Sequence, residues 1–495
     1  MNGCISWSPV LLSASLVFLA GTACGSNPAS GGDGAGGARP AADPPPAGWS
    51  DALALNVAVD LNPDPHILEV NLDARPASID FGFTNPTSVF TYNGSVPGPL
   101  LHAARGDTLI VHFTNHLPDE TSIHWHGVRV PAAMDGTPDA QPPTPAGGAF
   151  EYRFELPDAG LFWYHPHFRT TEQVAAGLYG AILVDDDASP PADFGPEMVL
   201  VLSDMDIRPD GTLAPYDPTD VLTMVFGRTG SVLLVNGRRD PTLLARPGQR
   251  QRWHVVNAAT TRYLRLGIAG QQLVRIGGDG GLREAPLDGA DFMLAPSERA
   301  DLLVVPDAAL PPATELAVQR LPYDRGYLQD TQPAETLFYL QLVGAPAVKV
   351  PAPLPAVLRT IEAVDLSRAT TKSVVIAEGM SDQGSFSFLV NGEPFAGGHT
   401  GAMEAHVGDN DVWSIENQTP SDHPIHLHGF FFQVIDPTTG LPGSPREWKD
   451  TVNVPQHSRL SFAVHYDDRP GMWMYHCHIL DHAELGLMGM LHLMP

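Results

Sequence analysis

The clearest structural signal in the chain is a ten-residue run from a glycine to an asparagine, Gly106-Asp107-Thr108-Leu109-Ile110-Val111-His112-Phe113-Thr114-Asn115. Its apolar centre is typical of a β-strand. The same glycine-to-asparagine spacing returns at 248–257 and 408–417. An Asn-Gly pair, which is a turn signal, precedes each copy, at 93–94, 236–237 and 391–392. The repeat predicts three copies of one β-sandwich unit.

Length and composition agree with this repeat. The chain has 495 residues, which suggests about three domains of roughly 150 residues each. It has 48 glycines, 48 prolines and no long amphipathic helical pattern, which favours many short strands. Breaks at the Asp-rich stretch 185–191 and the Pro-rich stretch 346–355 separate the units. We expect an all-β chain with domains at 49–187, 188–345 and 346–495.

The charge balance disfavours one class of partner. The formal net charge is −28, and the chain has only three lysines, Lys349, Lys372 and Lys449. No basic stripe is available to neutralise phosphates, so we expect no nucleic-acid binding.

The N-terminal segment has the pattern of an export signal. Residues 10–20 are apolar, too few to span a bilayer but suited to a signal-peptide core. Gly21-Thr22-Ala23-Cys24 resembles a bacterial lipoprotein cleavage site. We expect residues 1–24 to be a signal, residues 25–48 a flexible tether, and the protein to be periplasmic or extracellular, with a lipid anchor at Cys24. Ordinary cleavage nearby, with Cys24 removed or inert, is the alternative.

Ten of the 20 histidines lie in or beside four short motifs, His124-Trp125-His126, His165-Pro166-His167, His423-Pro424-Ile425-His426-Leu427-His428 and His476-Cys477-His478 with His482. Strand side chains alternate between faces, so both rings of a His-x-His pair point the same way. Four such pairs supply eight imidazoles, enough for two metals with three ligands and one with two. Imidazole and thiolate both favour copper.

Cys477 falls between two of these histidines. Alternation places its side chain on the face opposite His476 and His478. A metal bound by Cys477 would therefore be joined through a few covalent bonds to metals bound by its neighbours. His423 and His482 remain unassigned, and with Cys477 they form the His2Cys set of blue-copper electron-transfer sites.

All four motifs match, in order and separation, those of the multicopper oxidases (laccases, bilirubin oxidases and cuprous oxidases), and the resemblance extends over residues 50–495. It implies three consecutive cupredoxin-like Greek-key domains and four copper ions that couple oxidation of a donor to reduction of dioxygen to water. It also implies a ligand set: type 1 copper on His423, Cys477 and His482; type 2 on His124 and His426; type 3 on His126, His165 and His478, and on His167, His428 and His476.

Two carboxylates match the family at second-tier positions. Asp135 resembles the carboxylate that members place near the cluster to supply protons for oxygen reduction, and Glu484 falls near a second one. Asp135 has an alternative interpretation as a turn residue before Gly136, and Glu484 as a solvated glutamate. Ala483 stands where many bacterial members carry an acid.

Leu487, ten residues after Cys477, departs from the family pattern. Many bacterial relatives carry an axial methionine there, and a leucine side chain cannot coordinate a metal. The absence of this methionine ligand predicts a higher reduction potential for the type 1 copper than in Met-ligated relatives. A one-residue slip would bring Met488 into this position instead.

The electron donor is less clear than the centre. Cuprous oxidases of this family resemble the chain at 278–282 and 448–451, but carry a Met-rich insertion and an Asp/Met pair where this chain has Thr419 and Ser421. The methionines at 472, 474, 488 and 490 are spaced by two, which fits the core face of a strand better than a copper(I) port. We expect laccase-like oxidation of phenols or aromatic amines by a monomer, with periplasmic Cu(I) oxidation as the alternative.

The point at which electrons enter is expected at His423 or His482, on the edge of the type 1 site. Asp422 could orient a phenol there or serve as a turn residue, and both interpretations stay open. A non-catalytic relative that has lost copper ligands is disfavoured, because every ligand position is filled.

Overall fold

A computed structural model describes residues 44–186, 190–326, 333–380, 386–395, 397–398 and 402–495. This part of the chain consists mainly of β-strands in six sheets, which confirms the all-β prediction. The expected signal, Cys24 and most of the expected tether lie outside the described residues. Within the described ranges, no helix has the length and apolar character needed to cross a membrane.

The first repeat contains two four-stranded sheets, ordered β2-β1-β4-β6 and β3-β8-β7-β5. Side chains from both sheets, among them Leu72 and Trp125, share one buried cluster, so the core lies between the sheets. The elements are β1 (Ile67–Ile79), β2 (Thr87–Tyr92), β3 (Leu101–Ala104), β4 (Thr108–Asn115), β5 (His124–His126), η1 (Ala132–Met134), β6 (Ala149–Glu155), β7 (Gly160–His165), α1 (Thr170–Ala175) and β8 (Gly180–Asp185).

The second repeat pairs a six-stranded sheet, β10-β9-β12-β17-β14-β15, with a five-stranded sheet, β11-β19-β18-β13-β16. Its core again draws on both sheets, as Trp253 and Leu264 show. The elements are β9 (Glu197–Met205), α2 (Val221–Phe226), β10 (Val232–Val235), β11 (Thr242–Ala245), β12 (Gln251–Asn257), β13 (Leu264–Ile268), β14 (Leu273–Gly278), β15 (Gly281–Gly289), β16 (Asp291–Leu294), β17 (Arg299–Val304), β18 (Glu315–Leu321) and β19 (Glu335–Leu342).

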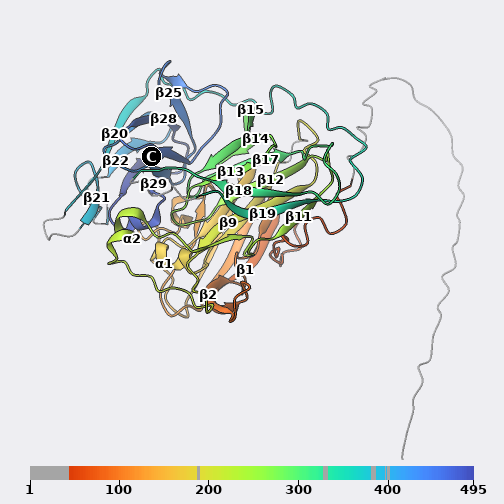
Figure 1. The fold of residues 1–495 in the computed structure, drawn as a ribbon. Helices are drawn as coiled ribbons and strands as arrows, with labels where there is room; N and C mark the ends of the chain where they lie inside the picture. Colours follow the sequence, from red (N-terminus) through yellow and green to blue (C-terminus); the bar gives the residue numbers. More distant parts are fainter. Residues whose placement is uncertain (1–43, 187–189, 327–332, 381–385, 396, 399–401) are drawn as a thin grey trace, which may run out of the picture. The chain divides into compact units, whose positions relative to one another are not determined.

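The third repeat has sheets ordered β21-β20-β23-β28-β25-β26 and β22-β30-β29-β24-β27, drawn in blue tones in Figure 1. Trp413 and Cys477 share its core. The elements are β20 (Thr370–Met380), β21 (Phe386–Val390), β22 (Met403–His406), β23 (Asn410–Asn417), β24 (His423–Leu427), β25 (Phe432–Asp436), β26 (Leu441–Pro442), β27 (Thr451–Val454), β28 (Arg459–His465), β29 (Gly471–Cys477), α3 (Leu480–Glu484) and β30 (Met488–Met494).

The three Asn-Gly pairs form the same turn in each repeat. Asn93, Asn236 and Asn391 have positive φ angles of 55°, 50° and 53°, and each is followed by a glycine with positive φ. Two successive residues with positive φ make the turn that matches strand twist, and asparagine and glycine adopt this conformation most readily. Each asparagine side chain also accepts a backbone N–H of the neighbouring strand, at 2.7, 2.6 and 2.8 Å.

The asparagines that end the three glycine-to-asparagine runs share a second role. Asn115, Asn257 and Asn417 are buried, and the amide of each donates to a carbonyl in the following loop and to a carbonyl of a segment farther along the chain. These loops lead into β5, β13 and β24. The sequence repeat is therefore a repeat of turn chemistry, and it positions the strand after each loop.

Candidate copper centres

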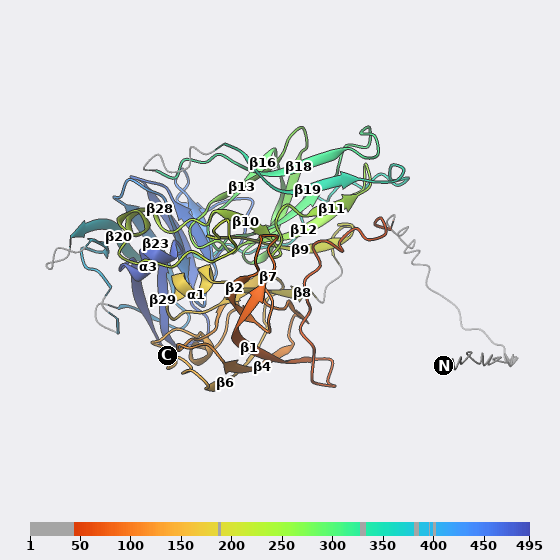
Figure 2. The same ribbon diagram turned by 60° about the horizontal axis from the view of Figure 1, so that its bottom comes forward.

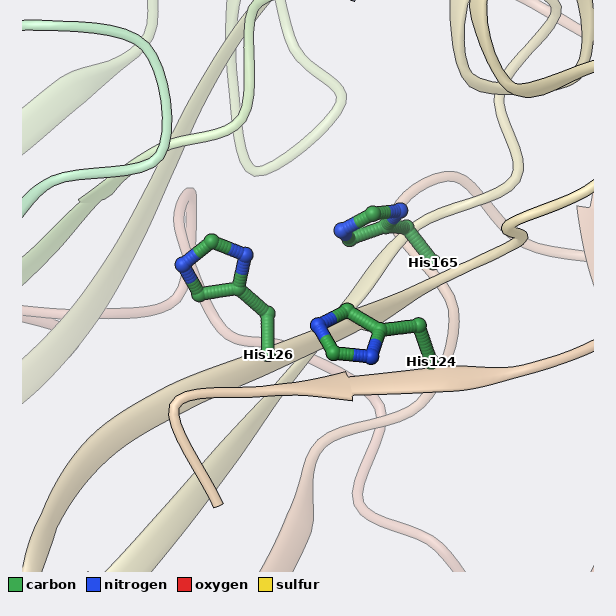
Figure 3. Close-up of side chains that lie close together, drawn as sticks. All are labelled: His124, His126 and His165. Carbon is green, nitrogen blue, oxygen red and sulfur yellow. The ribbon is translucent and has the colours of Figure 1, made fainter. Parts of the chain in front are cut away.

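Four strands carry the histidine motifs. In the first repeat β5 pairs with β7, so that His124 lies opposite His165. In the third repeat β24 pairs with β29, so that His426 lies opposite His476. Figure 3 shows the rings of His124 and His126 on the same side of β5, close to the ring of His165.

The histidines of the two repeats meet in the interior. His124 stacks on His428 with ring centres 3.9 Å apart, and His126 stacks on His426 at 3.7 Å. The helices beside them also meet, since α1 and α3 lie side by side (Figure 2). Seven of the eight paired histidines are no more than 2% exposed, and His167 is 8% exposed. The chain thus brings together eight imidazoles that are distant in sequence.

Neighbouring groups determine the tautomers of these rings. The Nδ1 atoms of His124, His165 and His426 each lie 2.8–2.9 Å from a backbone carbonyl oxygen and must donate to it. The Nε2 atom of each ring then carries a lone pair, and none of the three has a hydrogen-bond partner. Unsatisfied buried acceptors are costly, so these three nitrogens fit a bound cation.

The rings of His428, His476 and His167 are further evidence for a bound cation. His428 donates Nδ1–H to Asp135 Oδ2 at 2.9 Å, and His476 donates Nδ1–H to its neighbour's carbonyl at 2.8 Å. Their Nε2 lone pairs therefore face each other at 3.1 Å, with His167 Nε2 3.4 Å from that of His476. Lone pairs at this separation repel unless a cation lies between them, so the donor set fits copper.

The pKa values of the buried rings favour neutral ligands. Burial, reinforced for most of them by neighbouring imidazoles, lowers the pKa of His126, His165, His167, His428, His476 and His478, that of His167 to about 3. Neutral imidazole is the form that binds a metal.

His423, Cys477 and His482 form a separate buried group. Cys477 Sγ lies 3.5 Å from His423 Nδ1 and 4.0 Å from His482 Nδ1, and the two nitrogens are 3.2 Å apart. Burial raises the pKa of the Cys477 thiol and lowers that of His423 to about 3. A cation that holds the thiolate form therefore suits this site.

Strand register decides which residue faces Cys477. His476 lies opposite Met488, so Met488 shares the face of the cluster histidines. Leu487 lies on the other face, 1% exposed, in the core cluster that contains Cys477. The position next to the His2Cys group thus belongs to Leu487, without the one-residue slip considered above.

The outer edge of the His2Cys group is closed. His423 donates Nε2–H to Thr419 Oγ1 at 2.7 Å, and His482 donates Nε2–H to the carbonyl of Val225 in α2 at 3.1 Å. Both rings are fully buried. Asp481, beside His482, accepts the backbone N–H of Arg228 at 2.7 Å and so ties the segment after α2 to α3.

Asp422 does not face an open site. It is 2% exposed and accepts the Tyr323 hydroxyl at 2.5 Å, the Asn453 amide at 2.8 Å and a backbone N–H at 2.9 Å. This arrangement favours the structural interpretation of Asp422 over a role in orienting a substrate phenol.

Asp135 and Glu484 lie on two sides of the histidine cluster. Asp135 is 1% exposed; burial alone would raise its pKa, but contacts with His428 and His124 outweigh burial and hold it well below its usual value. Glu484 accepts the backbone N–H of Thr171 at 3.0 Å, and desolvation raises its pKa to about 7. Asp135 is therefore placed as a hydrogen-bond acceptor. Glu484 is an exposed residue at the end of α3, as its solvated interpretation expects, and its carboxyl group can exchange a proton with solvent near neutrality.

Sequence reasoning overlooked Asp450 and Arg299. Asp450 Oδ1 accepts His126 Nε2–H at 3.2 Å, and its backbone carbonyl accepts His426 Nδ1–H. Arg299, 1% exposed, pairs with both Asp450 oxygens and donates to the Leu161 carbonyl at 3.2 Å. One guanidinium from the second repeat thus joins the first and third repeats behind the cluster. The similarity at 448–451 was the available signal for Asp450, whereas the sequence held none for Arg299.

Comparison with known proteins identifies the family. Three multicopper oxidase family models match residues 75–189, 197–313 and 365–494. The chain is 31% identical to the multicopper oxidase MmcO of Mycobacterium tuberculosis, over 88% of this chain and 90% of that protein. It is 29% identical to a laccase of Bacillus subtilis, over 81% of this chain and 90% of that protein. The chain belongs to the multicopper oxidases.

Solved structures support the same assignment. A multicopper oxidase from Campylobacter jejuni, described as a metallo-oxidase, matches with a TM-score of 0.79 and 28% identity, over 89% of this chain and 94% of that one. One from Pseudomonas thermotolerans matches with a TM-score of 0.73 and 30% identity, over 86% and 99%. The protein is an oxidase with cupredoxin-like domains and the four coppers of its family.

Proposed function

We propose that the chain is a laccase-like oxidase that takes single electrons from phenols or aromatic amines and passes them to dioxygen. The observation that carries this proposal is the set of groups that contact the two His2Cys rings, which includes Thr419, a backbone carbonyl and the aromatic ring of Phe388, 4.1 Å from that of His482. Among the described residues, every compact group of nitrogen, thiolate or carboxylate donors belongs to the copper centres. An edge whose contacts are a hydroxyl, a carbonyl and an aromatic ring, with the Arg325 cation nearby, suits electron transfer from an organic donor better than capture of a metal ion.

The ligand assignment is part of the proposal. Type 1 copper would be held by His423, Cys477 and His482; type 2 by His124 and His426; type 3 by His126, His165 and His478, and by His167, His428 and His476. When bound, these coppers supply one-electron oxidation of the donor and four-electron reduction of dioxygen.

The chain's own residues would have three tasks in this reaction. Cys477 joins the two centres through its backbone bonds to His476 and His478. Asp135 keeps the His428 ring in its orientation by accepting Nδ1–H. Glu484 holds and delivers a proton at the cluster side. The resemblance alone assigns proton supply to Asp135 as well, but its lowered pKa makes Glu484 the better candidate.

Donors would dock on α2 rather than on a histidine. Val221 and Leu222 are 67% and 64% exposed on this helix, and the Val225 carbonyl contacts His482 directly. A Leu222→Asp variant should raise KM for 2,6-dimethoxyphenol several-fold and leave the thiolate-to-copper absorption unchanged. Leu287→Asp, at another exposed leucine (43%), is the matched control and should alter neither.

The donor class is tested by comparing kcat/KM for 2,6-dimethoxyphenol and for Cu(I) on the copper-loaded protein. We expect the phenol to be the better donor. A Cu(I) value well above the phenol value would instead support the alternative, a periplasmic cuprous oxidase in copper detoxification.

Leu487 should set the potential of the type 1 copper. A Leu487→Met variant introduces a thioether on the Cys477 face and should lower the reduction potential in a redox titration. Met488→Leu, on the opposite face, should leave the potential unchanged. Equal potentials in wild type and Leu487→Met would contradict the axial role.

A further inference from the structure

A row of methionines shares the strand face of His476. In the antiparallel pair of β29 and β30, His476 lies opposite Met488 and Met474 lies opposite Met490. Residues two apart on a strand, and residues directly opposite across a pair, point to the same side. The other side carries Tyr475, Cys477, Leu487 and Leu491, which belong to the core of the third repeat.

The spacing of these methionines predicts one core face, and Met474 and Met490 are among the buried hydrophobic residues of the described chain. None of Met474, Met488 and Met490 belongs to a hydrophobic core cluster of the described chain. Met474 and Met490 are nevertheless buried, at 2% and 3% exposure, and Met488 is half-buried. The face that carries them is therefore the face of His476, outside the five clusters that contain most of the sandwich core.

A cavity of about 420 Å³ lies against this face. Met474, Met488, His167, His476 and Glu484 are among its lining residues. His167 is the most exposed of the eight paired histidines. The cavity thus reaches two proposed ligands of one type 3 copper, while the other six paired histidines do not line it.

We propose that this cavity is the route by which Cu(I) enters the three-copper cluster, with Met474 and Met488 as transient ligands that pass the ion to His476 and His167. The route rests on the assignment of these two histidines to the cluster. Its physical basis is ligand preference: thioethers bind soft Cu(I) and bind it weakly, so transfer to imidazoles is favourable. The transfer exchanges ligands and involves no change of oxidation state.

Burial explains why such a route is needed. Close-packed side chains leave no passage for an ion, and seven of the eight paired histidines are at most 2% exposed. Glu484 adds oxygen donors at the cavity, and the net charge of −28 favours the approach of cations to the chain.

The test is metal loading of the copper-free full-length protein. Met474→Leu with Met488→Leu keeps side-chain volume and removes both sulfur atoms. Copper-free protein is exposed to Cu(I) without oxygen, and copper per chain and, after reoxidation, the thiolate-to-copper absorption are followed over time. The variant should fill the His423–Cys477–His482 site at the wild-type rate but acquire the remaining coppers about tenfold more slowly. Met198→Leu, a buried methionine of β9, is the matched control and should load normally.

Several results would overturn the route. One is wild-type loading of the cluster by the double variant; another is equal slowing at both centres. A raised KM for dioxygen with normal loading would make the cavity an oxygen path only. A wild-type chain that binds a single copper would overturn the ligand assignment and the route together. This outcome does not depend on which organic donor the oxidase uses. If the double variant does not fold, Met488→Leu alone, at the half-buried position, should still slow cluster loading.

Discussion

The strand after the asparagine loop differs between the second repeat and the other two. In the first repeat it carries His124 and His126, whose rings stack on His428 and His426 in the buried histidine cluster. In the second, β13 carries Leu264 and Leu266, buried at 1% and 4% in that repeat's core, with Arg265 paired to Asp291. The loop amide before the strand makes the same hydrogen bonds in both. The same loop and strand therefore form in a repeat whose strand has no metal-ligating side chains, and a few side chains on a repeated strand decide the chemistry.

Buried histidines show the same contrast electrostatically. His254 of the second repeat lies between Asp301, at 2.7 Å, and Glu197, at 3.2 Å. Burial alone would lower its pKa, but the two carboxylates outweigh burial and raise it. His423 has no such partner, and burial lowers its pKa to about 3. Two carboxylate contacts thus favour the protonated form of His254, whereas burial favours the neutral form of His423, which is the form that binds a metal.

The largest expected effect concerns the residue that connects the second repeat to the cluster. Arg299→Met leaves Asp450 as an unpaired buried charge, so the free energy of unfolding should fall by about 3–5 kcal/mol. Denaturant unfolding of the copper-free chain measures this. Arg265→Met is the matched control, because its ion pair with Asp291 is partly exposed and should contribute no more than about 1 kcal/mol. Equal losses in both variants would remove the special role of Arg299.

Substitution of the three loop asparagines should have a smaller effect on the free energy of unfolding, and it distinguishes a loss of stability from a loss of copper binding. Asn115→Ala, Asn257→Ala and Asn417→Ala should each cost about 1–3 kcal/mol, because each removes the hydrogen bonds that a buried amide donates to the loop and to a second segment. Only the first and third should also lower copper per chain, since only those loops position cluster strands. Metal analysis of the three purified variants tests this, and equal copper loss in Asn257→Ala would break the comparison.

The smallest effect is the pH dependence of His254, because desolvation offsets part of the carboxylate attraction. Its raised pKa means that its contribution to stability is complete below pH about 6.5 and is lost as pH rises through the folded-state pKa. The difference in unfolding free energy between wild type and His254→Gln should therefore shrink from pH 6 to pH 9. A difference that grows over this range would show that the ring is neutral in the folded protein.

Much of the site was predictable because its signals are local. Alternation along a strand places His124 with His126 and separates Cys477 from His476, and these relations need only the sequence. Turn chemistry is equally local, so the Asn-Gly pairs and the three glycine-to-asparagine runs revealed the repeat. The exported segment, the lipid anchor, the domain boundaries and the monomeric state stay predictions.

Other features needed the folded chain, because they depend on contacts between residues far apart in sequence. The sequence by itself determined an all-β chain of repeated units and the set of candidate copper ligands, since spacing and residue type specify both. Tertiary structure decided that Arg299 supports the cluster from another repeat and that α2 closes the type 1 edge. It also decided that Leu487 shares the core of Cys477 while Met474 and Met488 line a cavity, since strand pairing and long-range packing, rather than local spacing, determine what each side chain meets.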